Sequence, residues 1–334
     1  MTRILSPVAG ALSLACMITT GFHAHADEFG ERRSELRGGE IVEEGSVPDG
    51  VLAASAGVVE FGFGGGGICT GAIIAPTIIL TAAHCINGNP GPRSGTMNYS
   101  VDYHDPERGL RTVYAGPLDF VMHRDYNGLD DVSDARNDVA ILIARNRLLN
   151  VGTDDYARIF AGDEDGISDP IRFFGTGFLT FSGATDRTLR TAEFDVETID
   201  DELIRIDNRT ETSVCRGDSG GPGISSVFSG GEPIPAVSGV LSLALFDLRP
   251  LRGEGPNCAN NDPGPRGLWD NAWLARTTPA DLEEMFRFAR LEPCERETHA
   301  SSDYVRCFPV PLVNDTPGEG LDEPIGVAIT NLLL

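Results

Sequence analysis

Three short segments of this chain carry side chains whose types and order could support nucleophilic chemistry. They are residues 80–85 (LTAAHC) with His84, residues 136–142 (RNDVAIL) with Asp138, and residues 215–222 (CRGDSGGP) with Ser219. A serine hydroxyl is a weak nucleophile near neutral pH and needs a base within hydrogen-bonding reach to take its proton. An imidazole suits that task, and a carboxylate on its second nitrogen would fix the tautomer and stabilise the imidazolium ion. The sequence therefore predicts Ser219 as nucleophile, His84 as general base and acid, and Asp138 as the group that orients His84.

Each segment also has a structural interpretation when it is considered alone. A histidine after an apolar run is usually a core or turn residue, and Asn-Asp before a strand usually forms a turn. The third segment is the most specific, because glycines surround its serine in a complete CRGDSGGP run. All three segments in this order make coincidence a poor explanation.

Together, the segments resemble the chymotrypsin-like (trypsin-fold, S1-type) serine peptidase family. Residues 69–74 resemble the strand before the histidine, residues 174–177 the Gly-x-Gly turn of the second barrel, and residues 238–242 the strand that pairs with substrate. The similarity covers residues 36–290. It implies a serine endopeptidase that hydrolyses peptide bonds of protein or peptide substrates through an acyl-enzyme on Ser219 and requires no cofactor.

The distribution of apolar residues favours an all-β fold without reference to the family. Short apolar runs, such as residues 78–80 and 139–143, alternate with clusters of Gly, Pro, Asn and Asp, which is typical of a sandwich or barrel. Near the C-terminus, Thr278 as N-cap and Pro279 as the first helical residue predict a helix. Its apolar face contains Leu282, Met285, Phe286 and Ala289. With the resemblance, the expected fold is two packed six-stranded antiparallel β-barrels with a C-terminal helix and a short C-terminal extension.

The resemblance assigns further roles around the nucleophile. The backbone N–H groups of Gly217 and Ser219 are expected to form the oxyanion hole, where a side chain at position 217 could obstruct the approach. Asp218 is expected to form an ion pair with a new α-amino group released by propeptide cleavage. Residues 36–39 (LRGG) resemble the usual mature start, which makes Leu36 the partner of Asp218. Residues 41–42 (IV) offer a better apolar dipeptide without the two glycines, so the cleavage site stays open.

The resemblance also locates the substrate pocket. Ser213, six residues before the nucleophile, corresponds to the pocket floor, where trypsin-type members carry Asp. Ser242 lies on the substrate-pairing strand, and the pocket walls are expected at Ala244 and Gly267. An uncharged, open pocket favours large apolar or aromatic side chains before the scissile bond over Arg or Lys. The alternative is a charge on another wall, from Asp247, Glu254 or Asp270.

The cysteines predict disulfides. Six of the 7 cysteines remain once Cys16 leaves with an N-terminal signal, and an even set in an exported protein predicts three bridges. Sequence order favours the pairs Cys69–Cys85, Cys215–Cys258 and Cys294–Cys307. Zinc is the competing interpretation, but no two cysteines have C-x-x-C spacing and no histidine pair has helical ligand spacing. The sequence therefore predicts no catalytic metal, and it leaves open a structural calcium ion in the acidic loops.

The N-terminus predicts export. Residues 1–26 combine an early Arg3, an apolar stretch and the small-residue pattern AHA at 24–26, which is typical of a cleaved secretory signal. Residues 27–35 are a propeptide or linker, residues 36–290 the peptidase domain, and residues 291–334 a C-terminal extension with a disulfide. No apolar stretch is long enough for a permanent membrane span. We expect a secreted or periplasmic protein that acts as a monomer.

The acidic composition restricts the classes of partner. The 334-residue chain has a formal net charge of -24, and nucleic-acid binding is excluded because it requires Lys and Arg to neutralise phosphates. A strongly hydrated surface is the simpler explanation of acids spread along the chain, and a steering field for cationic substrates is the alternative. Two other functions stay open: a catalytically silent binding homologue, and a narrowly specific peptidase that acts on one partner.

Overall fold

The structure is a computed structural model, in which Arg33–Leu334 forms one compact unit. The described residues are 39–43, 58–63, 67–75, 77–86, 92–105, 109–128, 132–144, 148, 157–160, 164–177, 187–208, 212–229, 232–244, 271–289, 291 and 312–313. The expected signal and propeptide lie outside this set, as does nearly all of the C-terminal extension. Their bounds therefore stay predictions.

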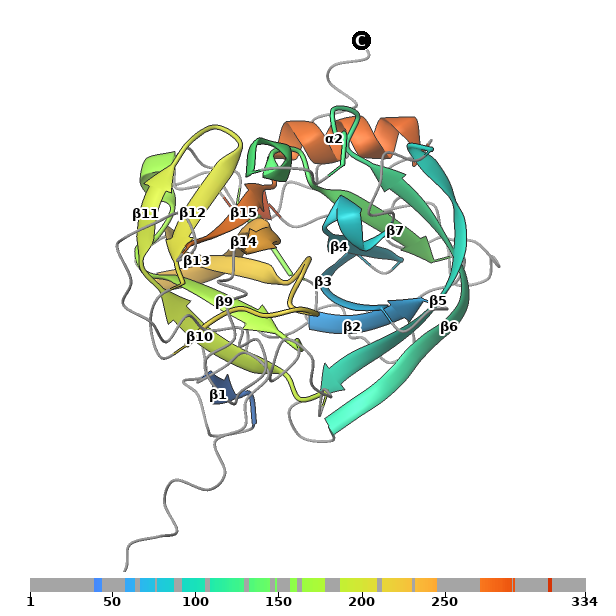
Figure 1. The fold of residues 1–334 in the computed structure, drawn as a ribbon, viewed down its shortest axis with the longest axis horizontal. Coiled ribbons are helices and arrows are strands. Elements are labelled where there is room, and N and C mark those ends of the chain that lie inside the picture. The colour runs from blue at the N-terminus through green and yellow to red at the C-terminus, as the bar shows by residue number, and fades with distance from the viewer. Residues whose placement is uncertain are drawn as a thin grey trace, which may run out of the picture. The chain divides into compact units, whose positions relative to one another are not determined.

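The first half of the chain forms a closed antiparallel barrel (Figure 1). Its strands are β2 (Val58–Phe63), β3 (Gly67–Ala75), β4 (Ile78–Thr81), β5 (Ser94–Asp105), β6 (Gly109–Met122) and β7 (Ala140–Ala144). They pair around the barrel in the order β2-β3-β4-β7-β6-β5. Strands β4 and β7 are buried at every residue. This burial explains why their sequences are continuous apolar runs without polar alternation.

The second half of the chain, together with the N-terminal strand β1, forms a largely antiparallel sheet in the order β1-β10-β9-β13-β14-β15-β12-β11 (Figure 1). Its strands are β1 (Glu40–Ile41), β8 (Ile159–Phe160), β9 (Ile171–Gly175), β10 (Arg190–Phe194), β11 (Val196–Ile199), β12 (Leu203–Asp207), β13 (Pro222–Ser229), β14 (Glu232–Ala244), β15 (Asn271–Arg276) and β16 (Leu312–Val313). The expected chymotrypsin-like arrangement is confirmed, with one difference. Within the described residues this sheet does not close, so it forms a half-barrel, and the short β8 pairs with β14 and β16 in parallel.

Each half of the fold has an aromatic pair in its apolar core, and the barrel core continues into the second sheet through Phe174 and Val240. In the barrel, the Phe61 and Tyr99 rings meet edge to face with their centroids 5.7 Å apart. In the second sheet, Phe173 and Phe194 meet in the same way at 6.3 Å. Such aromatic pairs add to the free energy of burying the rings themselves. Strand β3 of the barrel contacts β13 of the second sheet, which brings together the parts of the chain that carry Cys69 and Ser219.

The predicted C-terminal helix is confirmed as α2 (Pro279–Phe288). Thr278 is its N-cap: the Thr278 hydroxyl accepts from the Asp281 N–H, and the Asp281 carboxylate accepts from the Thr278 N–H. The expected apolar face is buried in the barrel core or against it. Its members are Leu282, Met285, Phe286 and Ala289.

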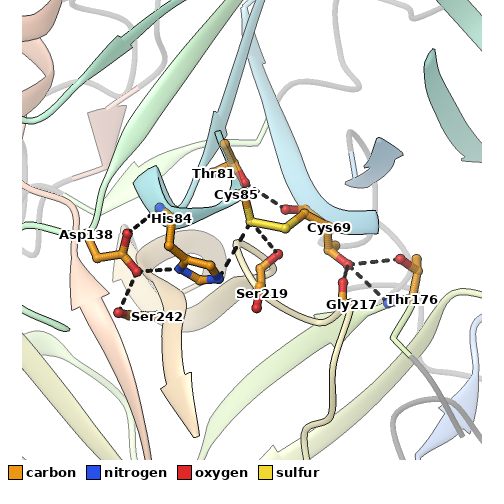
Figure 2. The surroundings of a disulfide bond; sticks show 10 residues. Cys69, Thr81, His84, Cys85, Asp138, Thr176, Gly217, Ser219 and Ser242 are labelled. Atoms are coloured by element: carbon orange, nitrogen blue, oxygen red, sulfur yellow. Dashed lines mark hydrogen bonds and ion pairs between the residues drawn. A yellow bond between two sulfur atoms is a disulfide. The ribbon is translucent and has the colours of Figure 1, made fainter. Parts of the chain in front are cut away.

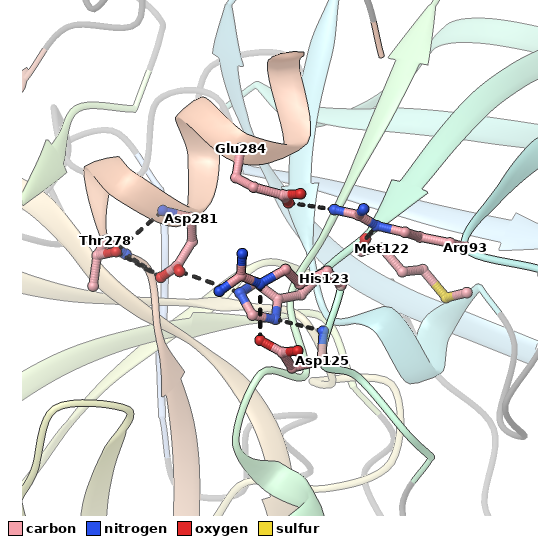
Figure 3. A network of polar contacts seen from close by, with 8 residues as sticks. Arg93, Met122, His123, Asp125, Thr278, Asp281 and Glu284 are labelled. Atoms are coloured by element: carbon pink, nitrogen blue, oxygen red, sulfur yellow. Dashed lines mark hydrogen bonds and ion pairs between the residues drawn. The ribbon is translucent and has the colours of Figure 1, made fainter. Parts of the chain in front are cut away.

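Polar contacts also hold α2 on the barrel (Figure 3). His123 Nδ1 accepts from the Asp125 N–H at 3.2 Å, and His123 Nε2 lies 3.2 Å from Asp281 Oδ1. A neutral ring with its hydrogen on Nε2 satisfies both contacts. Burial raises the pKa of Asp281, but hydrogen bonds from His123 and Thr278 outweigh it, so the pKa lies below its ordinary value.

Arg187 ties the segment before β10 to the barrel. Its Nε donates to Glu60 Oε1 at 2.6 Å, and its guanidinium also pairs with Asp102. Glu60 on β2 and Asp102 on β5 are cross-strand neighbours, and both carboxylates are almost fully buried. Burial raises the pKa of Glu60, while Arg187 opposes this shift. One partly exposed cation thus compensates two buried acids.

Candidate active site

His84 lies in the short helical turn η1 (Ala83–Cys85) that follows β4. The turn is fixed to β3 by the disulfide between Cys69 and Cys85, which confirms the first predicted bridge. The imidazole is 18% exposed, so it faces solvent while its backbone is anchored. This anchoring matters because a catalytic base must keep its position while it exchanges protons.

Asp138 holds the inner edge of the imidazole (Figure 2). Its Oδ2 lies 2.7 Å from His84 Nδ1, and its Oδ1 accepts from the His84 backbone N–H at 2.8 Å. Ser242 Oγ donates to the same Oδ2 at 2.6 Å. The carboxylate is fully buried, so these donors replace the water that it loses. Because a carboxylate only accepts, Nδ1 carries the hydrogen and Nε2 is left as the basic nitrogen.

The loop before Asp138 is held from the second sheet. Arg136 donates to Asp200 Oδ2 at 2.7 Å and to Glu202 Oε2 at 2.8 Å. The next residue, Asn137, has a φ of 61°, a conformation that Asn tolerates better than most residues. The chain thereby turns sharply enough to direct Asp138 inward just before β7. The contacts of Arg136 were not predicted from the sequence.

Ser219 lies in the turn between Asp218 and β13, beside the histidine. The Ser219 carbonyl oxygen and His84 Nε2 lie 3.5 and 3.9 Å from the same atom, Cys85 Sγ (Figure 2). The three residues predicted to act together are thus gathered in one place. Within the described part of the chain, no hydrogen bond links Ser219 Oγ to His84 Nε2. In unliganded sites such contacts often tighten only when substrate binds.

The turn before Ser219 presents backbone donors. The Asp218 N–H donates to the Cys215 carbonyl at 3.1 Å, and Gly217 has a φ of +92°, which is the geometry of a type II turn. A Cβ at Gly217 would lie 2.9 Å from Gly177 Cα, so both conformation and space require glycine. Among the described residues, neither the Gly217 N–H nor the Ser219 N–H has a hydrogen-bond partner. Two unpaired N–H groups beside a serine are what an oxyanion hole needs.

Asp218 holds the backbone around the nucleophile from inside the protein. It is fully buried. Its Oδ1 accepts from the Gly177 N–H at 2.8 Å and its Oδ2 from the Cys215 N–H at 2.7 Å. Burial raises the pKa of Asp218 to about 7 even though these hydrogen bonds and the charge of Arg190 lower it. The predicted partner, Leu36, lies outside the described residues.

The pocket residues are only partly described. Ser213, the predicted floor, is buried, and its Oγ has no hydrogen-bond partner among the described residues. Ala244 is half-buried, and its cross-strand partner on β15 is Ala272. The predicted wall residue Gly267 lies outside the described residues. Sequence reasoning did not predict this pairing, because the register of β15 cannot be counted through the insertion after β14.

A second buried oxygen without a partner among the described residues lies near Ser213. Asn271 Oδ1 is buried without a partner, and Asn271 pairs with Asp207 at the end of β12. The next residue, Asn208, accepts from the Val214 N–H at 3.0 Å, and Val214 follows Ser213. In the described part of the chain, two buried oxygens without hydrogen-bond partners, Ser213 Oγ and Asn271 Oδ1, therefore lie near this end of β12.

The bonding state of the cysteines decides whether they could bind a metal ion. Cys215 is also disulfide-bonded, and its partner lies outside the described residues. The other cysteines of the predicted bridges, Cys258, Cys294 and Cys307, lie outside the described residues as well. Among the described residues, one cluster has the spacing of metal ligands: Cys69, His84 and Cys85. Both sulfurs of that cluster are consumed in the disulfide, so neither can act as a thiolate ligand.

No helix in the described part of the chain is long and apolar enough to cross a membrane.

Comparison with known proteins agrees with this geometry. A family model described as Trypsin matches residues 51–246. The chain is also similar to "Serine protease Hayan" of Drosophila melanogaster, with 24% identity over 249 residues that cover 67% of this chain and 36% of the relative. The chain thus spans about a third of the length of that relative. Because the family model covers more than half of its residues, the chain belongs to the trypsin family, the chymotrypsin-like serine peptidases.

Proposed function

We propose that this protein is an exported serine endopeptidase that cleaves peptide bonds in proteins or peptides. The observation that carries the proposal is the pairing of Asp138 with His84 Nδ1 beside Ser219, where the N–H groups of Gly217 and Ser219 have no hydrogen-bond partner among the described residues. A binding module would gain nothing from a buried carboxylate aimed at an imidazole or from unsatisfied donors beside a hydroxyl.

The proposed reaction has two stages, formation of an ester on Ser219 and hydrolysis of that ester. Ser219 Oγ attacks the carbonyl carbon and gives its proton to His84 Nε2, while the carbonyl electron pair moves onto oxygen. The N–H groups of Gly217 and Ser219 stabilise that oxyanion. Collapse expels the amine, which takes the proton from His84, and leaves an ester on Ser219. Water then attacks the ester with His84 again as base, which releases the acid and restores the hydroxyl.

The proposal includes a preference for an uncharged side chain before the scissile bond. Ser213 carries no charge, and its hydroxyl, which has no partner among the described residues, offers a hydrogen bond rather than an ion pair. Arg and Lys would leave a buried cation without a counter-charge, which is costly. We also propose, on the sequence alone, removal of residues 1–26, activation by cleavage before Leu36, action as a monomer outside the cytoplasm, and independence of cofactors.

The direct test is cleavage of a peptide library by the mature protein. We expect turnover by the wild type, none by Ser219→Ala, and wild-type turnover by Ser100→Ala, which removes an exposed hydroxyl from the barrel. The cleavage profile should show few Arg or Lys residues before the scissile bond. Absence of turnover by the wild type, together with no reaction with a fluorophosphonate, would favour a silent binding homologue. Reaction with the fluorophosphonate but no library cleavage would favour a peptidase restricted to one partner.

A further inference from the structure

The two residues with unpaired N–H groups share an anchor on the barrel. Thr70 Oγ1 donates to the Gly217 carbonyl at 2.9 Å, and the Thr70 backbone N–H donates to the Ser219 carbonyl at 2.9 Å. Thr70 lies on β3, next to Cys69 of the disulfide. Both carbonyl groups are therefore directed at one barrel residue.

The Thr70 hydroxyl is saturated with hydrogen bonds. It also lies 2.9 Å from Thr176 Oγ1 and accepts from the Thr176 N–H at 3.2 Å. A hydroxyl has one hydrogen to donate and two lone pairs to accept with. Because the hydrogen goes to Gly217, Thr176 Oγ1 must be the donor in the contact between the two hydroxyl groups. Thr70 and Thr176 are both fully buried, so water does not substitute for any of these contacts.

We propose that Thr70 is a positioning residue that keeps the turn at Gly217 in its type II form and so keeps the oxyanion donors in place. This inference rests on the proposed function. The Thr70 contact fixes the peptide unit between Gly217 and Asp218, and Asp218 closes the same turn. In the alternative type I turn, the preceding peptide unit is reversed, and the Gly217 N–H would leave the oxyanion site. That reversal changes the φ of Gly217 from positive to negative, and the Thr70 hydroxyl opposes the change because it holds the carbonyl group of the same residue.

Thr70→Val tests the inference, because valine keeps the shape and the strand preference but cannot donate. We expect the rate of reaction with a fluorophosphonate probe to fall by about tenfold to a hundredfold. This fall is no larger than the one that follows removal of a whole oxyanion donor. Thr70→Ser keeps the hydroxyl and should react at close to the wild-type rate. Thr191→Val is the matched control: it removes a buried hydroxyl that donates to the Phe173 carbonyl at 3.0 Å, away from the turn.

Crystal structures of the wild type and of Thr70→Val give a readout that does not depend on activity. We expect Gly217 to keep a positive φ in the wild type and to lose it in the variant. The inference fails if Thr70→Val reacts at the wild-type rate, if its turn is unchanged, or if Thr191→Val slows the reaction equally. A wild type that does not react with the probe, while its turn still depends on Thr70, would refute the proposed function and leave the inference standing.

Discussion

Replacement of Arg187 by methionine should destabilise the protein by removing the cation that two buried acids share. Methionine keeps much of the side-chain length and places the same demand on the backbone, where Arg187 has a φ of 58°. After the change, Asp102 retains the Thr112 hydroxyl as a donor at 2.6 Å. Glu60 has no such substitute among the described residues, where its Oε1 pairs with Arg187 and its Oε2 lacks a partner.

The size of the effect follows from the exposure of the three groups. Removal of one partner from a fully buried ion pair costs about 3–5 kcal/mol, and exposed pairs contribute about 0–1 kcal/mol. The acids are 2% and 5% exposed, but Arg187 is 43% exposed, so water screens part of the interaction. We therefore expect Arg187→Met to lower the free energy of unfolding by about 2–3 kcal/mol near neutral pH.

The loss should depend on pH in a defined direction. Burial already raises the pKa of Glu60, and removal of Arg187 raises it further. The folded variant then binds a proton that the unfolded chain releases, so its stability falls as pH rises. Urea unfolding should show a larger loss at pH 8 than at pH 5, and Glu60→Gln in the variant should recover part of it. Arg124→Met, which breaks the exposed contact with Asp125, should have no measurable effect. A loss of under about 1 kcal/mol, or one that is the same at both pH values, would refute the reasoning.

Four further outcomes are expected. Asp138→Asn should lower kcat by about ten-thousandfold in a peptide cleavage assay, because the amide favours the wrong His84 tautomer, and a loss of under tenfold would contradict the assigned role. A precursor without a free amino group at Leu36 should lose stability as pH rises from about 4 to about 7, because the raised pKa keeps Asp218 protonated to a higher pH in the folded state than in the unfolded chain. The mature form should not show this loss, and equal urea-unfolding curves for the two forms would contradict the ion pair. Replacement of Cys69 and Cys85 by alanine should lower the free energy of unfolding by about 3 kcal/mol, as measured by urea titration, with an unchanged free energy as the contrary result. EDTA should leave the cleavage rate intact, and complete loss of activity would indicate a required metal ion.

Local sequence signals predicted the parts of the site that are continuous in the chain. The segments around His84, Asp138 and Ser219 each contain both the side chain and the turn or strand that orients it. The start of α2 was predictable for the same reason, because the capping contacts between Thr278 and Asp281 are three residues apart. Short-range hydrogen bonds depend on neighbouring residues, so they can be recognised from spacing.

Contacts between distant segments could not be predicted in this way. Thr70 and Thr176 are 106 residues apart, and Arg187 meets Glu60 across 127 residues. Threonine is common in strands and arginine is common in loops, so neither residue type indicated a long-range contact. Thr70 lies in the predicted strand before the histidine, next to Cys69, but its role depends on its hydrogen bonds with Gly217 and Thr176, which are distant in the sequence.

The pocket wall and the second sheet show a different limit. The walls were expected at Ala244 and Gly267, of which Gly267 lies outside the described residues. The pairing of Ala244 with Ala272 on β15 could not be predicted, because strand register cannot be counted through a long insertion. The second sheet was expected to close into a six-stranded barrel, and in the described residues it stays open. Closure depends on the geometry of pairing between strands that are far apart in sequence.

The most direct test is to locate a covalent adduct after the mature protein reacts with a fluorophosphonate. The account predicts one adduct per chain, found by tandem mass spectrometry on Ser219, and a strongly reduced rate in His84→Ala. An adduct on another residue, or labelling of Ser219 that does not depend on His84, would contradict the claim that this hydroxyl is activated by that imidazole.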